Sequence, residues 1–285
     1  MSWTSRLMVY DFEEGKSFPV LETDMHIAAP NWAPEGDALI VNGDGSLFWV
    51  DLENPELWEI DTGLCIKLNN DHGVTPDGET LIFSDHTYGQ GAVIWTQKLG
   101  DETEGADPNR VTPNSPSWWH GVSPDGKTLT YTAVRNGMFG IYTIPIEGGD
   151  ETCVIEGDHH YDGPDFTADG DWIWFNSERS GNGSSDLWRV RVDGSDVEQM
   201  TDDARVNWFP HPSPDGDKVV YVSYLEGVEG HPEGQEVELR LFKGKDIAPE
   251  TIVSLYGGQG TLNVPSWSPD GVAFAYVEYA RPDQA

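Results

Sequence analysis

One four-residue phrase recurs six times along the 285-residue chain: Ser, Thr or Ala, then a small residue that is usually Pro, then Asp or Glu, then Gly. The copies lie at residues 33–36, 75–78, 123–126, 167–170, 213–216 and 268–271. Ser or Thr suits the first position of a tight turn, Pro presets φ at the second, and Gly tolerates a positive φ at the last. Each copy precedes a short run of β-branched and aromatic residues, and most copies also follow one. Each phrase is therefore predicted to be a hairpin turn between two strands.

The spacing of the copies predicts how these strands assemble. Successive final glycines, from Gly36 to Gly271, stand between about 40 and 55 residues apart. A period of this length with about four strands per unit is typical of a β-propeller. The last unit stops near Tyr279 after only two strands, and the segments 6–10 and 18–21 offer the missing pair. The alternative is six unrelated turns in another all-β protein.

We therefore predict an all-β fold in which residues 1–285 form a single six-bladed β-propeller. Each blade is expected to be a four-stranded antiparallel sheet, with the N-terminal strands closing the last blade. Such closure leaves no open sheet edge. Because a closed propeller needs no partner for stability, we expect a monomer.

The charge of the chain limits its partners. Its 50 acidic residues against 16 basic ones give a net charge of −34. Nucleic acid is excluded as an expected partner, because binding it requires a basic face. One interpretation is a halophilic adaptation to a salt-rich cytoplasm, where the screening length falls to about 3 Å at 1 M salt. The alternative is an ordinary acidic, soluble protein.

The location is predicted from what the sequence lacks. No run is long and apolar enough to span a membrane, and the first residues lack the apolar region of a signal peptide. The two cysteines, Cys65 and Cys153, lie in different repeats, so we expect no disulfide and a reducing compartment. We therefore expect a cytoplasmic protein without a membrane partner, unless a presequence has been removed.

Histidine and aspartate recur just before the turn phrases. In a propeller the first strand of each blade lines the central channel, so these residues are expected to meet at one channel mouth. His72 and His120 lie three places before the first residue of their phrases, and His211 and Asp165 lie two places before theirs. Imidazole and carboxylate are ligands for Mn, Zn, Fe or Ni, so these four side chains are candidate ligands of a divalent metal ion. The alternative is that they only form hydrogen bonds with the backbone near the axis.

Other channel and loop residues are candidates for binding or catalysis. Carboxamides, carboxylates and aromatic rings near the same positions suit a small-molecule or oligosaccharide ligand. The rings that flank these positions would either stack on a sugar or pack between blades, and they are Trp118, Trp119, Trp208 and Phe209. The candidate ligand-binding residues are Asn31, Trp119, Asp162, Trp208, Gln235 and Asn263. The longest insertion, residues 224–235, contributes His231, while Arg135 and Arg179 follow two of the turns at similar offsets. Each arginine would pair either with a substrate carboxylate or with one of the many protein acids.

The phrases resemble the TolB-type, WD-like propeller repeat over nearly the whole chain, and Trp267-Ser268-Pro269-Asp270-Gly271 is a particularly good match. Stand-alone propellers with such repeats include the oligogalacturonate lyase family. That resemblance implies a Mn-like ion, with Zn or Ca as alternatives, held by channel side chains that would include His72, His120 and His211. It also implies β-elimination on uronate oligomers, with His231, Arg135 or Arg179 as the catalytic base. The other interpretation is a non-catalytic binding or protein-interaction propeller.

Overall fold

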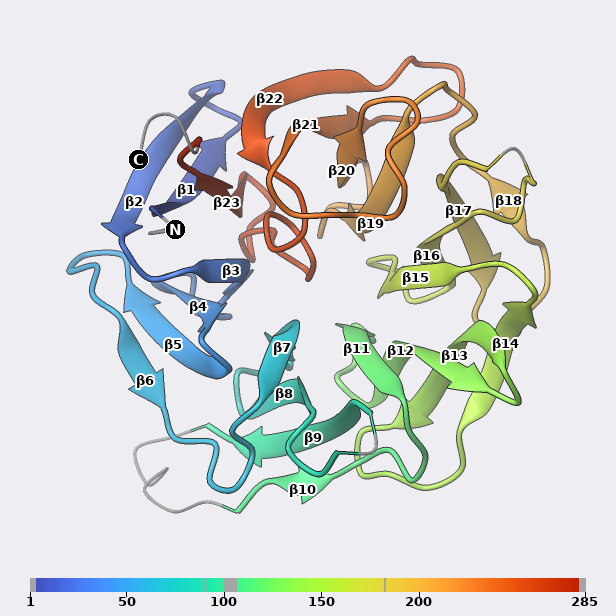
Figure 1. Cartoon of the computed structure of the whole chain (residues 1–285), viewed down its shortest axis with the longest axis horizontal. Coiled ribbons are helices and arrows are strands. Elements are labelled where there is room, and N and C mark those ends of the chain that lie inside the picture. Colours follow the sequence, from blue (N-terminus) through green and yellow to red (C-terminus); the bar gives the residue numbers. More distant parts are fainter. Residues whose placement is uncertain (1–3, 90, 100–106, 182, 282–285) are drawn as a thin grey trace.

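The computed structural model describes residues 4–89, 91–99, 107–181 and 183–281. Within these residues, 23 strands form six sheets arranged around a central opening (Figure 1). This arrangement confirms the predicted six-bladed propeller. Among the described residues, no helix has the length and apolar character needed to cross a membrane.

Five of the sheets contain four antiparallel strands each, and the chain enters each of them at the strand nearest the opening (Figure 1). The first two are β3 (Ile27–Trp32), β4 (Ala38–Gly43), β5 (Ser46–Asp51) and β6 (Trp58–Ile60), followed by β7 (Leu68–Val74), β8 (Thr80–Asp85), β9 (Val93–Lys98) and β10 (Asn109–Arg110). The next two are β11 (Ser117–Val122), β12 (Thr128–Arg135), β13 (Met138–Pro145) and β14 (Thr152–Gly157), followed by β15 (Tyr161–Phe166), β16 (Trp172–Ser177), β17 (Asp186–Arg191) and β18 (Glu198–Gln199). The fifth is β19 (Val206–Pro212), β20 (Val219–Tyr224), β21 (Gln235–Phe242) and β22 (Glu250–Gly257).

The sixth sheet joins the two ends of the chain. It contains β1 (Ser5–Asp11), β2 (Lys16–Thr23) and β23 (Ala273–Tyr279), in the order β2–β1–β23. Pairing of β1 with β23 confirms that the N-terminal strands close the last blade. This sheet has three strands, whereas four were expected, because the segment before β23 contributes only an isolated bridge from Trp267 to Phe274. Pro265 in that segment lacks the backbone N–H that a continuous ladder needs.

The six turn phrases share one geometry. In each, the Gly N–H donates to the carbonyl oxygen of the first residue at 2.8 to 2.9 Å, and the Gly φ lies between +72° and +78°. In the five copies that begin with Ser or Thr, the hydroxyl donates to the Asp carboxylate and accepts the N–H of the residue five places on. The side chain thus fixes both ends of the turn.

Apolar side chains fill the spaces between neighbouring sheets. One cluster joins Trp208 and Leu239 of the fifth sheet to Phe274 and Tyr276 of β23. Another joins Ile40 of β4 to Phe83 of β8. These contacts between sheets hold the inner strands at fixed positions around the channel, so that side chains from different blades meet there.

Candidate ligand-binding site at the channel mouth

A cavity of about 300 Å³ opens where several inner strands begin. Half of its lining residues come from the inner strands β7, β11, β15 and β19, and the other half come from β12, β13 and three loops. The lining residues are Asn69, Asp71, Trp118, His120, Thr132, Phe139, His160, Asp162, Phe209, His231, Gln259 and Asn263. They come from four of the six blades and from the segment that leads into β23, so residues far apart in sequence share one cavity.

Bulges in the inner strands direct side chains into the cavity. The pairing register shifts between Asp162 and Asp165 in β15 and between Trp208 and His211 in β19. At these shifts Gly163 and Phe209, each followed by Pro, have φ of +58° and +54°. Such a bulge bends a strand and changes which face its side chains occupy. Asp162 and Phe209 consequently line the cavity.

His120 is held as an imidazolium in this cavity. Its Nε2–H donates to Asp162 Oδ1 at 3.0 Å, and its Nδ1–H donates to the carbonyl oxygen of Asn263 at 3.3 Å. Because both ring nitrogens face acceptors, both carry a proton. Burial lowers the pKa of His120, but the charges of Asp71 and Asp162 outweigh it and raise the pKa to about 9.

Asp162 is held as a carboxylate by several donors. Its Oδ1 accepts hydrogen bonds from His120, from the Thr132 hydroxyl at 3.0 Å and from the Gly163 N–H at 2.9 Å. Its Oδ2 lies 3.6 Å from Nε2 of His231. Burial alone would raise its pKa, but the hydrogen bond and charge of His120 lower it well below the usual range.

Asp71 has a different environment in the same cavity. It is 5% exposed, and its Oδ2 accepts one hydrogen bond from Asn69 Nδ2 at 2.5 Å. Burial raises the pKa of Asp71 to about 6, although the charge of His120 opposes this shift. The two carboxylates of the cavity therefore differ in how well they are satisfied by donors.

Aromatic rings form much of the remaining wall. The His231 ring lies 4.3 Å from the ring of Trp208 and 5.1 Å from that of Phe209, measured between centroids. His231 Nδ1 also forms a hydrogen bond with Gln259 Oε1, and burial lowers the pKa of the imidazole. The His160 ring lies 4.5 Å from that of Phe139. The cavity thus combines polar acceptors with rings on which a cyclic ligand would stack.

Comparison with known proteins agrees with this architecture. A family model described as the TolB beta propeller domain matches residues 111–237. An uncharacterized protein of Agrobacterium fabrum is 44% identical over 280 residues, which cover 98% of this chain and 93% of that protein. The chain belongs to the TolB-type β-propeller family. A solved structure from Agrobacterium tumefaciens, provisionally named TolB, has 43% identity and a TM-score of 0.93, and the match covers 98% of this chain and 99% of that one.

A more distant likeness extends to an oligogalacturonate lyase solved in complex with manganese. It is 14% identical with a TM-score of 0.57, and the match covers 94% of this chain and 70% of that one. At this identity the likeness shows the fold alone. Metal binding by this TolB-type propeller therefore depends on its own side chains.

The predicted metal ligands do not gather around one point. His72 Nε2 contacts the carbonyl oxygen of Ile40 at 3.2 Å, and burial lowers the pKa of His72 to about 4. His211 Nδ1 pairs with Asp165 Oδ2 at 3.1 Å, whereas His120 pairs with Asp162. Within the described residues, no three His, Cys, Asp or Glu side chains are placed to share a metal ion. The residues present do not fit the implied metal, and its binding stays a prediction.

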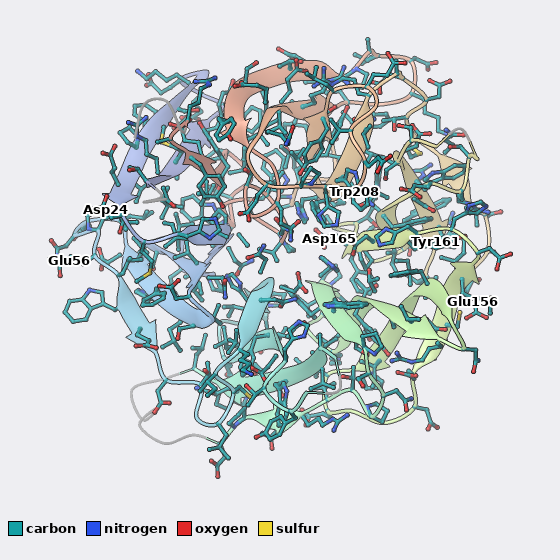
Figure 2. The ribbon with its side chains drawn as sticks, viewed as in Figure 1. Asp24, Glu56, Glu156, Tyr161, Asp165 and Trp208 are labelled. Atoms are coloured by element: carbon teal, nitrogen blue, oxygen red, sulfur yellow. The ribbon has the colours of Figure 1, made fainter. Side chains whose placement is uncertain are left out.

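The other predicted residues divide between the cavity and the protein interior. His231, Asp162 and Asn263 line the cavity as proposed, although their roles stay predictions. Trp208, labelled near the centre of Figure 2, is buried behind His231, and Trp119 is buried against Gly73.

Four other predicted residues lie outside the cavity lining. Asn31 donates to the carbonyl oxygen of Pro265, and Gln235 begins β21. Arg135 pairs with Glu151, and the Arg179 guanidinium lies 4.8 Å from the ring centre of Trp188. Each arginine is thus engaged within the protein, away from the cavity.

Trp118 and Phe209, two of the rings expected beside the channel positions, line the cavity, whereas the sequence prediction did not assign the remaining lining residues to ligand binding. These are Asn69, Asp71, Thr132, Phe139, His160 and Gln259. Strand alternation offers a signal for Asp71, because it adjoins the predicted His72 but points the opposite way. His160 and Gln259 lie in loops, where no periodic pattern indicates which way a side chain points.

Proposed function

We propose that this TolB-type propeller binds a small, hydroxyl-rich ring of the sugar class in the channel-mouth cavity. The observation that carries the proposal is the combination of Trp118, Phe139 and Phe209 with the acceptors of Asp71 and Asp162 in one cavity of about 300 Å³. Aromatic rings stack on the apolar faces of a sugar, while carboxylates and carboxamides accept hydrogen bonds from its hydroxyl groups. A cavity of this size lies at the lower end of the range for small-molecule sites.

Binding without metal-dependent turnover is the form of the proposal that the geometry favours. The cavity lining, as given by the described residues, contains two carboxylates and neither Lys nor Arg. Both N–H donors of the His120 imidazolium are used by Asp162 and Asn263, so a uronate carboxylate would meet like charge without a free cation to pair with it. The metal-dependent uronate lyase implied by the resemblance is the alternative. Uronate oligomers that bind more tightly than neutral sugars when Mn²⁺ is added would favour that alternative.

Titration calorimetry with a panel of neutral mono- and disaccharides tests the proposal. Trp118→Ala removes a ring from the cavity wall, and we expect it to weaken binding by about five- to tenfold. Trp58, which is 59% exposed on the outer strand β6, provides the matched control, and Trp58→Ala should leave the affinity unchanged. The proposal fails if no sugar binds, or if both substitutions have the same effect.

A further inference from the structure

Asp71 is a buried carboxylate without a cationic partner in contact. It is 5% exposed and lines the cavity, and one donor, Asn69 Nδ2, reaches its carboxylate. The Asn69 side chain also accepts the Asp71 backbone N–H at 3.2 Å, which fixes the carboxylate in place. Among the ion pairs of the described residues, none includes Asp71. Burying a charge is costly unless it is paired, so this group is expected to gain a partner when the site is filled.

The nearby positive charge is already engaged elsewhere. The His120 imidazolium contacts Asp162 Oδ1 at 3.0 Å and the Asn263 carbonyl oxygen at 3.3 Å, which uses both of its N–H donors. Asp162 in turn accepts additional hydrogen bonds from Thr132 and Gly163. One carboxylate of the cavity is therefore neutralised and well satisfied by donors. The negative charge of Asp71 remains for the ligand.

The rest of the cavity also favours a cation. Trp118, Phe139 and Phe209 line it, and the faces of aromatic rings attract ammonium groups. The net charge of −34 adds a negative field over the whole molecule, which raises the local concentration of cations. A hydroxyl-rich ligand with an amino group would satisfy the acceptors and the unpaired charge together.

We infer that the ligand carries a protonated amino group that pairs with Asp71, as an amino sugar does. This inference rests on the proposed sugar site, and it specifies the substrate class within that site. The ammonium would donate to the Asp71 carboxylate while the ring lies among Trp118, Phe139 and Phe209. Charge-assisted hydrogen bonds of this kind are about twice as strong as neutral ones.

Titration calorimetry with glucosamine, glucose, glucuronate and benzylamine tests the inference. For the wild type we expect glucosamine to bind at least about tenfold more tightly than glucose, and glucuronate to bind least. Asp71→Asn keeps the shape of the side chain but removes its charge, so glucosamine should then bind no better than glucose. Asp24 lies on the exposed rim, far from the opening in Figure 2, and Asp24→Asn removes the same charge as a control that should keep the preference.

The outcomes separate the two proposals. Equal binding of glucose and glucosamine to the wild type overturns the amine inference while the sugar site stands. Binding of benzylamine that is lost in Asp71→Asn, without any sugar binding, supports the amine inference and overturns the sugar site. The inference is overturned if Asp71→Asn keeps the preference for glucosamine over glucose, or if Asp24→Asn loses that preference to the same extent. If none of the ligands binds, both proposals are overturned. If Asp71→Asn does not fold, N-acetylglucosamine, which lacks the ammonium, serves instead, and binding as tight as that of glucosamine overturns the inference.

Discussion

At the scale of single residues, Arg135 shows how a candidate catalytic side chain is part of the scaffold. Its Nε and Nη2 donate to the two carboxylate oxygens of Glu151 at 2.6 and 2.7 Å, and both side chains are largely buried. Tyr131 also donates to Glu151 at 2.9 Å, and Arg135 Nη1 donates to the carbonyl oxygen of Pro116. This network joins β12 to the segments that precede β11 and β14. We therefore expect removal of the pair to alter stability.

Glu151 should make stability depend on acid pH. Hydrogen bonds from Arg135 lower the pKa of Glu151 from 4.5 to about 2, although burial opposes the shift. Because the pKa is lowered in the folded state, the stabilisation is complete above pH 4.5 and is lost as the pH falls towards 2. Glu151→Gln should reduce the free energy of unfolding at pH 7 by about 1 to 3 kcal/mol and flatten its decline in acid. Chemical denaturation across this pH range measures both effects.

The matched control is Glu236→Gln, which removes an exposed pair with Arg281. Its effect should stay within about 0.5 kcal/mol, because exposed pairs contribute little. An acid profile of Glu151→Gln identical to that of the wild type would contradict the prediction.

The repeat predicts which residues lie near the channel, but it only partly predicts which way their side chains point. Alignment on the turn phrases brings His120, Asp162 and Asn263 towards one mouth, and all three line the cavity. Alternation and bulges then decide which of two neighbours faces the cavity, and a shift of one residue exchanges the faces. The Trp119 ring packs so closely on Gly73 that a Cβ there would lie 2.2 Å from it, so the absence of a side chain at Gly73 makes room for Trp119. Because neighbouring side chains of a strand point opposite ways, Trp118 then faces the cavity.

At the scale of elements, the turn phrases contact one another around the ring of blades. The Pro ring of one copy lies 3.5 to 3.8 Å from the position that a Cβ would take on the Gly of the next copy, in five of the six cases. Gly216 is the exception, because the preceding copy carries Ala168 and no atom lies within 4 Å. A groove of about 1010 Å³ opens at this break, between the turns that contain Ala168 and Gly216.

Ala168→Pro should restore the missing contact. Neither backbone hydrogen bond of this turn uses the Ala168 N–H, so proline removes no bond from it. The change should raise the free energy of unfolding by about 0.4 to 1 kcal/mol, mainly by restricting the unfolded chain. Urea denaturation measures it, and Pro124→Ala in the preceding copy should lower stability by a similar amount. A destabilised Ala168→Pro protein would show that the backbone here differs from that of the other turns.

At the scale of the whole molecule, the repeat was enough to predict the propeller and its closure, because every copy marks a hairpin and the chain ends complement each other. The irregular closing sheet was not predictable in the same way. Its innermost position is filled by a segment with one bridge, Trp267 to Phe274, and Pro265 prevents a regular ladder there. Loops such as the one carrying His231 complete the cavity, and their paths depend on contacts between blades.

The charge of the molecule leads to a prediction about salt. With a net charge of −34, repulsion among exposed acids opposes the compact state at low ionic strength. The screening length falls from about 10 Å at 0.1 M to about 3 Å at 1 M, so the free energy of unfolding should rise steeply over this range of KCl. Sucrose is the control, because it strengthens burial without screening charge, and it should give a shallower rise. If the free energy of unfolding does not change with KCl across this range, the folded protein tolerates the repulsion among its acidic residues without screening. The acidic surface would then be no adaptation to salt.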